Sequence, residues 1–337
     1  MKATLGRTGL TVNKDGFGAL PVQRANMGDA VRILQKALDG GIDYFDTARA
    51  YTDSEEKIGA AISARRGEFI LATKTTAANA EDFRKDLETS LRSMKTGHID
   101  IYQFHNPDQY PRPGDGSGLY EAMLQAREQG KIRFIGITNH RRDIAHEAVE
   151  SGLYDTLQFP LSYLSDEKDQ ALVQLCAEKN VGFIAMKALS GGLITDVAAA
   201  RSFLAAFPPV VPIWGIQRES ELDALFAAMQ QPVVLTGEQR RRIEKDRQEL
   251  SGNFCRACDY CLPCPAGIVI SMCARMFLLL HRMPAGPLLS EQWQKEMAKI
   301  PNCIHCNHCK DHCPYGLDTP ALLARNYEDY QNVLAES

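Results

Sequence analysis

The sequence lacks several features that would place the protein in a membrane, outside the cell or on nucleic acid. Met1–Leu20 contains no long apolar core, so we expect no signal peptide. The most apolar later stretch, Ile268–Met283, is interrupted by Arg275 and His281 and is too short to span a bilayer. The formal net charge of −4 argues against a nucleic-acid or anionic-membrane partner. We therefore expect a soluble, cytoplasmic protein.

Cysteine is almost absent from the first three quarters of the chain, where Cys176 stands alone, and the other nine lie between Cys255 and Cys313. Their short spacings are unusual for disulfides and fit reduced, metal-binding thiolates in a cytosolic compartment. The composition is otherwise ordinary for a globular chain. With 337 residues, 45% of them hydrophobic and 24% charged, the chain can form one large domain and a small one.

Short apolar runs alternate with amphipathic helical patterns over the first 235 residues or so. Eight strands are predicted, at Gly16–Leu20, Asp43–Thr47, Phe69–Lys74, Ile99–His105, Ile132–Asn139, Thr156–Leu161, Val181–Leu189 and Val210–Ile216. No G-x-G-x-x-G motif follows the first strand, which disfavours a doubly wound sheet. Eight strand–helix units of this size predict a (β/α)8 barrel.

Two further segments frame this barrel. Met1–Val12 has the pattern of a hairpin, and we expect it to plug the lower mouth of the barrel. Glu238–Leu250 is a charge-dense helix that we interpret as a connecting helix, with a docking surface for an acidic redox partner as the alternative. The predicted domains are residues 1–250 and residues 251–337, with the boundary near Ser251.

Four chemically active side chains follow consecutive predicted strands, at the end where barrels carry their chemistry. They are Asp46 and Tyr51 after the second strand, Lys74 at the end of the third and His105 at the end of the fourth. A tyrosine with an ordinary pKa of ~10 is a poor acid or base at neutral pH. A nearby ammonium favours its phenolate, and a carboxylate can hold that ammonium in place. The four residues therefore form a plausible proton-transfer set.

The motifs around these residues resemble the aldo-keto reductase family. The segments are Phe45–Ala48 with Tyr51–Glu55, then Leu71–Lys74, then Gln103–Asn106. The resemblance covers residues 1 to about 230. It implies a (β/α)8 barrel that uses NADP(H) or NAD(H). It also implies that Tyr51 is the proton donor, that Lys74 and Asp46 adjust the pKa of Tyr51, and that His105 orients the substrate.

The same resemblance implies a set of cofactor-binding residues: Thr138, Asn139, Gln158, Met186, Lys187, Gly191, Gly192, Gln217 and Arg218. Thr138, Asn139 and Gln158 correspond to positions that hold the nicotinamide carboxamide, and Met186 would lie under the ring. The glycine pair would let backbone amides approach the pyrophosphate. After the eighth strand, Glu219 and Glu221 would repel a 2′-phosphate, so the choice between NAD and NADP stays open.

The late cysteines form two runs, each followed by proline. The second run, Cys303, Cys306, Cys309 and Cys313, has the C-x2-C-x2-C-x3-C-P spacing of a cubane iron–sulfur site. The first, Cys255, Cys258, Cys261 and Cys264, is one residue shorter before its proline. Since the fourth cysteine of such a run usually completes the other cluster, we assign Cys313 to the first three cysteines and Cys264 to the later three.

These spacings predict two 4Fe–4S clusters in a small, mostly α-helical ferredoxin-like domain. Zinc is the alternative metal, because three histidines lie among the second set, at His305, His308 and His312. Cys176 and Cys273 break the spacing and are interpreted as core residues. Some bacterial and archaeal aldo-keto reductases carry such a domain, and the whole chain is similar to that subset.

Two functions are compatible with these features. The first is an NAD(P)-dependent oxidoreductase acting on a carbonyl or alcohol substrate, with clusters that relay electrons, help to dock a redox partner protein, or serve as structure. The second is an iron–sulfur electron-transfer protein whose barrel binds a nucleotide, flavin or partner and does little carbonyl chemistry. No flavin motif is visible. Because nicotinamide delivers two electrons and a cubane accepts one, direct coupling would need a flavin or an electron-splitting substrate.

Overall fold

The computed structural model describes residues 1–250, 254–282 and 285–336. Ser251, the predicted domain boundary, and Met283, the end of the apolar stretch, lie outside these ranges. The chain divides into two compact units that we describe separately. One comprises Met1–Ala188 and Asp196–Ile243, and the other comprises Leu189–Thr195 and Glu244–Ser337.

The first unit is a closed barrel of parallel strands in the order β10-β3-β4-β5-β6-β7-β8-β9. The strands are β3 (Gly16–Gly18), β4 (Tyr44–Asp46), β5 (Ile70–Thr75), β6 (Ile99–His105), β7 (Ile132–Thr138), β8 (Thr156–Pro160), β9 (Gly182–Met186) and β10 (Val210–Gly215). All eight predicted strands are present. The (β/α)8 prediction is therefore confirmed.

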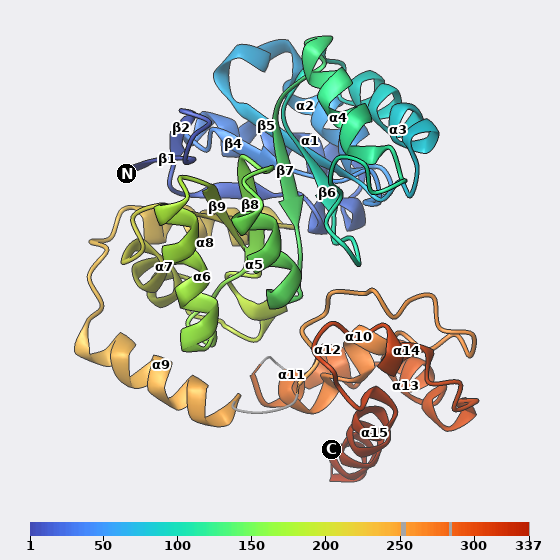
Figure 1. Cartoon of the computed structure of the whole chain (residues 1–337). Helices are drawn as coiled ribbons and strands as arrows, with labels where there is room; N and C mark the ends of the chain where they lie inside the picture. Colours follow the sequence, from blue (N-terminus) through green and yellow to red (C-terminus); the bar gives the residue numbers. More distant parts are fainter. Residues whose placement is uncertain (251–253, 283–284, 337) are drawn as a thin grey trace. The chain divides into compact units, whose positions relative to one another are not determined.

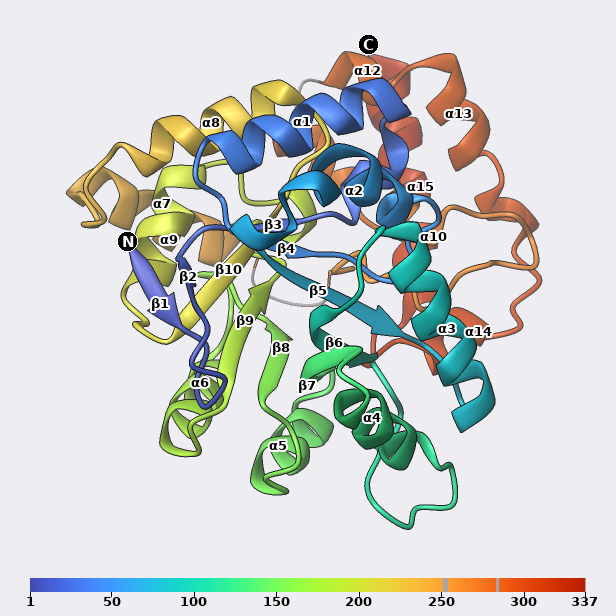
Figure 2. The ribbon, with the colours of Figure 1, turned by 90° about the horizontal axis from the view of Figure 1, so that it is seen from above.

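Helices lie outside the strands, as Figure 2 shows most clearly. They are α1 (Met27–Asp39), α2 (Ser54–Ile62), α3 (Ala80–Ser93), α4 (Leu119–Glu128), α5 (Arg142–Glu150), α6 (Glu167–Glu178), α7 (Val197–Ala205) and α8 (Glu219–Met229). Two short 3-10 turns, η1 (Pro21–Arg24) and η2 (Ser63–Glu68), interrupt the connections. Several helices begin at a capping side chain, for example Asn26 and Asn79, whose amide oxygens accept the backbone N–H three residues on.

The opening segment is an antiparallel hairpin of β1 (Lys2–Thr4) and β2 (Thr11–Asn13). Its buried residues Leu5 and Val12 belong to one apolar cluster with Tyr44 and Ile101 from the barrel strands. Because these barrel residues lie in the N-terminal parts of their strands, the hairpin closes that end, as predicted.

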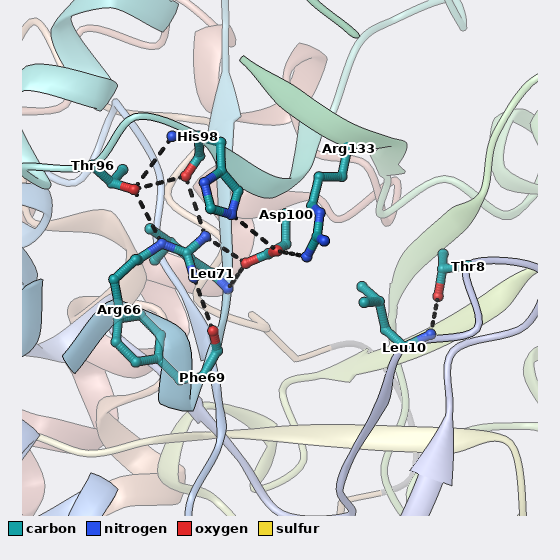
Figure 3. A network of polar contacts seen from close by, with 9 residues as sticks. All are labelled: Thr8, Leu10, Arg66, Phe69, Leu71, Thr96, His98, Asp100 and Arg133. Carbon is teal, nitrogen blue, oxygen red and sulfur yellow. Dashed lines mark hydrogen bonds and ion pairs between the residues drawn. The ribbon is translucent and has the colours of Figure 1, made fainter. Parts of the chain in front are cut away.

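A charged network ties the same end of the barrel together (Figure 3). Asp100, which is 1% exposed, accepts hydrogen bonds from the backbone N–H of Leu71 at 2.9 Å, Arg66 Nη2 at 2.6 Å and Arg133 Nη1 at 3.0 Å. The carboxylate thus links β5, β6 and β7. These contacts stabilise the barrel at this end, and the opposite ends of the strands are available for chemistry.

The second unit is helical in its described part, apart from loops. Its helices are α10 (Ile270–Cys273), α11 (Met276–Arg282), α12 (Ala285–Leu288), α13 (Glu291–Met297), α14 (His308–Asp311) and α15 (Thr319–Glu336), with 3-10 turns η3 (Ser190–Gly192) and η4 (Ile300–Asn302). Helix α9 (Gly237–Glu249) contains the division between the two units.

Helix α15 is the centre of this unit and packs against α10, α11 and α14 (Figure 1). Tyr330 is fully buried and donates its hydroxyl to Leu288 O at 3.0 Å. Asn326 Oδ1 accepts from Phe277 N at 2.9 Å. Cys273 and Cys176 are both fully buried, which confirms their interpretation as core residues. Among the described residues of the whole chain, no helix is both long and apolar enough to cross a membrane.

Candidate active site and iron–sulfur region

Asp46, Lys74 and His105 lie at the carboxyl ends of the neighbouring strands β4, β5 and β6, and Tyr51 lies in the loop after β4. Register explains how they meet, because Asp46 pairs with Ala72 and Lys74 pairs with Gln103 across parallel ladders. Parallel strands bring their carboxyl ends to one side of the sheet. The structure therefore brings the four predicted residues together.

Lys74 and Asp46 form a buried ion pair, with exposed fractions of 1% and 2%. Lys74 Nζ also donates to Thr47 O at 2.6 Å. Two amides complete the shell of the carboxylate. Gln103 Nε2 lies 3.0 Å from Asp46 Oδ2, and Gln158 Nε2 lies 3.3 Å from Oδ1. Burial raises the pKa of Asp46, and the hydrogen bonds from Lys74 and the two amides oppose that rise.

Tyr51 lies over this pair. The ammonium of Lys74 is 5.2 Å from the centroid of the Tyr51 ring, within the range of a cation–π contact. Burial has the largest effect and raises the pKa of Tyr51 above 10, while the charge of Lys74 lowers it. The lysine thus moderates the rise without reversing it. The phenol stays protonated at neutral pH, as a proton donor requires.

His105 contacts the tyrosine edge-on, with ring centroids 5.7 Å apart and an interplanar angle of 85°. Burial, followed by the positive charge of Lys74, lowers the pKa of His105 to about 3. Its imidazole is therefore neutral at physiological pH and can donate one N–H to a substrate oxygen.

The loop that carries Tyr51 is held from both sides. Glu55, which is 1% exposed, accepts hydrogen bonds from Thr73 Oγ1 and Ser90 Oγ, both at 2.7 Å, and pairs with Arg49. The backbone N–H of Arg49 donates to Lys74 O at 2.9 Å. Fixed neighbours of this kind hold a reactive side chain in place.

Three of the residues predicted to bind the cofactor lie beside this site, at the ends of β7 and β8. Thr138, Asn139 and Gln158 are all at most 2% exposed. The Asn139 side chain is engaged locally, since it donates to Pro107 O at 2.9 Å and accepts from Arg141 N at 2.8 Å. Gln158 Oε1 is buried and has no hydrogen-bond partner within the described ranges. That oxygen is an acceptor available to a ligand amide.

The residues after β9 are divided between the units. Met186 ends β9 and packs on the barrel core, and the following Lys187 has a left-handed backbone, with φ of 61°. The charge of Lys187 contributes, after burial, to lowering the pKa of His140. Gly191 and Gly192, with φ of 68° and 94°, belong to the second unit, where Arg275 Nη1 donates to Gly191 O at 2.6 Å.

Gln217 and Arg218 lie after β10, at the start of α8. The carboxylate of Glu221 accepts from the backbone N–H of both residues, at 2.8 and 3.2 Å. The Arg218 side chain is 69% exposed, and its Nε lies 3.5 Å from Glu221. The neighbouring Glu219 pairs with Arg32 and Lys36 of α1. The cations near the start of α8 thus already have carboxylate partners.

The eight run cysteines gather into two sets that mix the runs. The pKa of Cys255 is raised mainly by burial, with a contribution from Cys313, and that of Cys261 by burial and then by Cys255 and Cys258. The pKa of Cys309 is raised mainly by burial, and Cys303, Cys264 and Cys306 add to the rise. Cysteines of the two runs thus influence one another electrostatically.

A small cavity adjoins the second set. Five cysteines line it together with apolar residues: Cys261, Cys264, Cys303, Cys306 and Cys309. No group of three or more His, Cys, Asp or Glu side chains in the described part of the chain has the arrangement of a single-ion site. A cubane differs from a single ion in that it holds its thiolates at separate corners, farther apart than one ion does.

Fold and side chains together define a (β/α)8 protein with the buried Asp46–Lys74 pair, Tyr51 and His105 near the carboxyl ends of its strands, and with a cysteine-rich unit after it. The chain belongs to the aldo/keto reductase family, which residues 15–202, more than half of its length, match. Residues 254–318 match a 4Fe-4S dicluster domain.

Several known proteins are similar to this chain. L-galactose dehydrogenase of Arabidopsis thaliana is 31% identical over 211 residues, which are 57% of this chain and 66% of that protein. Aldo-keto reductase YhdN of Bacillus subtilis (strain 168) is 28% identical over 207 residues, 56% of this chain and 62% of that protein. The chain thus spans about two thirds of the length of these curated relatives.

Solved structures share the fold. The aldo-keto reductase AKR11C1 from Bacillus halodurans in its holo form has a TM-score of 0.63 and 23% identity, and the match covers 73% of this chain and 95% of that one. At this identity the likeness shows the fold alone.

Two residues of the site were not predicted. Gln103 lies within a motif used for recognition, yet its contact with Asp46 has no local signal, because 57 residues separate them. His140 follows Asn139 and is 6% exposed. Burial lowers its pKa well below the usual value, so a second neutral imidazole lies near His105. The only sequence signal for His140 is its position just after a predicted strand, which places it at the same end of the barrel as His105.

Proposed function

We propose that the barrel transfers a hydride between a nicotinamide cofactor and a carbonyl or alcohol carbon, with Tyr51 as the proton donor. The observation that carries this proposal is the Lys74 ammonium, which is held by the buried Asp46 and lies 5.2 Å from the centroid of the Tyr51 ring. Family membership supports the same chemistry. The substrate class is a small carbonyl compound or the corresponding alcohol.

The residues at the ends of β7 and β8 fit a nicotinamide. Gln158 Oε1 is a buried acceptor with no partner in the described part of the chain, and it can accept from a carboxamide NH2. Thr138 Oγ1 accepts from Asn106 N at 3.1 Å, which leaves its own proton for a carboxamide oxygen. When bound, NADH or NADPH supplies the hydride.

In the direction of reduction, the substrate carbon gains a hydride and its oxygen gains a proton from Tyr51. His105, neutral throughout, donates a hydrogen bond to the same oxygen and orients it. The ammonium of Lys74 then faces the phenolate that Tyr51 becomes, and stabilises it. In the reverse direction Tyr51 receives the proton, so atoms and charge balance both ways.

Charge near α8 favours NAD(H) over NADP(H). Family resemblance places the adenosine 2′-position at Gln217 and Arg218. There Glu221 caps the backbone N–H groups and pairs with Arg218, and Arg32 and Lys36 are engaged by Glu219. A doubly charged phosphate would have to displace these carboxylates, whereas a hydroxyl can donate to them.

For the second unit we propose two 4Fe–4S clusters. Cys255, Cys258, Cys261 and Cys313 would hold one, and Cys264, Cys303, Cys306 and Cys309 the other. The grouping of the thiols and the dicluster match support these ligand sets. The second set is the more accessible, because Cys306 is exposed and the adjacent Ile304 is 64% exposed. A redox partner protein would exchange single electrons at this loop.

A second candidate function is an electron-transfer protein whose barrel binds a nucleotide, flavin or partner without carbonyl chemistry. The presence of a complete dicluster domain favours it. Anaerobic iron, sulfide and flavin quantification separates the two ideas, because bound flavin would supply the step between two-electron and one-electron carriers.

The deciding experiment is Tyr51→Phe, assayed by NADH and NADPH oxidation with benzaldehyde. We expect a loss of about a hundredfold or more in kcat, the usual contribution of a general acid. Tyr120→Phe is the matched control, since Tyr120 lies on the outer helix α4 and its hydroxyl donates to Leu153 O. Activity that survives Tyr51→Phe would reject Tyr51 as the donor, and a wild-type protein inactive with every carbonyl would favour the second function.

A further inference from the structure

Lys57 is a buried lysine that the proposed chemistry does not use. It lies on α2, and its side chain is only 2% exposed. A lysine is almost never buried this completely unless its ammonium is fully hydrogen-bonded. Its partners therefore indicate what it does.

The ammonium of Lys57 is surrounded by oxygens of two loops. Three are backbone carbonyls at the end of η1: Val22 O at 3.1 Å, Gln23 O at 3.3 Å and Ala25 O at 2.7 Å. The fourth is Asp53 Oδ1 at 2.7 Å. An ammonium has three donors, so the four acceptors use it completely.

Both loops belong to the strand ends that carry the site. The segment Pro21–Ala25 follows β3, and Asp53 is two residues from Tyr51. The residue between them, Thr52, has φ of 40°, a left-handed conformation that is costly for a β-branched side chain. Such a conformation persists only where the surrounding contacts fix it. Asp53 gives α2 no side-chain cap, because its carboxylate is turned to Lys57.

We propose that Lys57 is a positioning residue for catalysis. Its ammonium joins the loop after β3 to the segment that carries Tyr51, so that the loop beside the substrate and the proton donor keep one fixed geometry. The inference rests on the proposed function only for its kinetic consequence. The structural link itself stands on the four contacts.

Lys14 offers a matched control at the opposite end of the barrel. It is 6% exposed, lies just before β3, and donates from Nζ to Ala205 O at 3.0 Å and Phe207 O at 2.8 Å, at the end of α7. Lys57→Met and Lys14→Met thus remove the same kind of buried cation with carbonyl partners. Both should lower the midpoint of thermal unfolding.

The two variants should differ at the site. By hydrogen exchange, the amides of residues 22–26 should exchange about tenfold faster or more in Lys57→Met than in the wild type, since the variant leaves the carbonyls of Val22, Gln23 and Ala25 without this donor. Lys14→Met should leave these amides unchanged. With benzaldehyde and NADH, Lys57→Met should raise KM and lower kcat/KM about tenfold, while Lys14→Met keeps wild-type kinetics.

Unchanged exchange at residues 22–26 in folded Lys57→Met would overturn the proposal, as would an equal kinetic change in Lys14→Met. If Lys57→Met does not fold, Lys57→Gln keeps two N–H donors, and its exchange should be intermediate; wild-type exchange in Lys57→Gln would likewise overturn the proposal. A wild-type protein without reductase activity would remove the proposed function, but the exchange comparison would still test the link.

Discussion

Gln103 Nε2 donates a hydrogen bond of 3.0 Å to the Asp46 oxygen that Lys74 does not bind. Both side chains are buried, at 0% and 2% exposure. The amide therefore fixes the carboxylate in the orientation that faces the ammonium, and through it the position of Tyr51.

Replacing Gln103 with Leu should weaken catalysis without removing a reacting group. The substitution leaves a buried carboxylate oxygen without its donor, which costs ~1–3 kcal/mol. We expect kcat to fall about tenfold, with little change in the KM for NADH. Parallel assays of Gln103→Leu and the wild type provide the check, and an unchanged kcat would show that the amide contributes nothing to the alignment of Lys74.

Activity in the direction of reduction should depend little on pH across the neutral range. His105, with a pKa of about 3, is already neutral above about pH 5. Tyr51 must be protonated to donate, and its pKa is raised above 10, so its acid form is lost only as pH rises through that value. Oxidation of the alcohol needs the phenolate and should speed up over the same alkaline range.

The measurement is kcat against pH in both directions, with the barrel checked for unfolding at each pH. A fall in reduction between about pH 6 and pH 8 would contradict the protonation states assigned to Tyr51 and His105.

Asp100→Asn should separate stability from catalysis. Asp100 is buried between Arg66 and Arg133 at the end of the barrel opposite the site, so its neutralisation leaves two cations without their partner. Arg133 is 55% exposed and Arg66 is 17% exposed, so water compensates part of the lost pairing, and we expect a loss of ~1–3 kcal/mol. Urea unfolding should show this loss, while kcat/KM of the folded variant stays within about twofold of the wild type.

Glu68→Gln is a suitable comparison, since Glu68 pairs with Arg65 on the surface and its side chain is 53% exposed. Surface pairs contribute less than ~1 kcal/mol. Equal losses in Asp100→Asn and Glu68→Gln would mean that the buried network is not what holds β5, β6 and β7 together.

Single cysteine variants should reveal the crosswise ligand sets. Two intact cubanes hold eight irons, so disruption of one should leave about half of the iron and one set of electron paramagnetic resonance signals. Cys313→Ser should affect the same signal as Cys255→Ser, and Cys264→Ser the same signal as Cys303→Ser. If Cys313→Ser instead matched Cys303→Ser, each run would bind its own cluster.

Glu221→Gln should shift the preference between the two nicotinamide cofactors. A glutamine can still accept the backbone N–H of Gln217, but it carries no charge against a phosphate and releases Arg218. Fluorescence titration should show NADPH affinity rising severalfold and NADH affinity staying near its original value. A tighter NADPH than NADH complex in the wild type would refute the assigned role of Glu221.

The barrel and its main site could be predicted because both follow from periodic patterns. Alternating apolar runs locate the strands. Parallel strands then bring residues such as Asp46, Lys74 and His105 to one end of the barrel, whatever conformation the connecting loops adopt. The 4Fe-4S dicluster domain was predictable for a similar reason, since a cubane constrains the spacing of its ligands.

Contacts between distant loops could not be predicted in this way. Lys57 has the sequence context of an ordinary helix lysine, and its carbonyl partners lie more than thirty residues earlier, in a turn without a recognisable motif. The pKa of Tyr51 could not be predicted from the sequence either, because it depends on how deeply the phenol is buried as well as on the charge of Lys74.

The seven residues Leu189–Thr195 belong to the iron–sulfur unit although barrel elements flank them in the chain. That unit is therefore assembled from two separate stretches of the chain. They are linked by a hydrogen bond from Arg275 to the carbonyl of Gly191, 84 positions earlier. A gene truncated after the barrel would leave this insertion without the rest of its own domain. No single cut in the chain therefore separates the residues of one unit from those of the other.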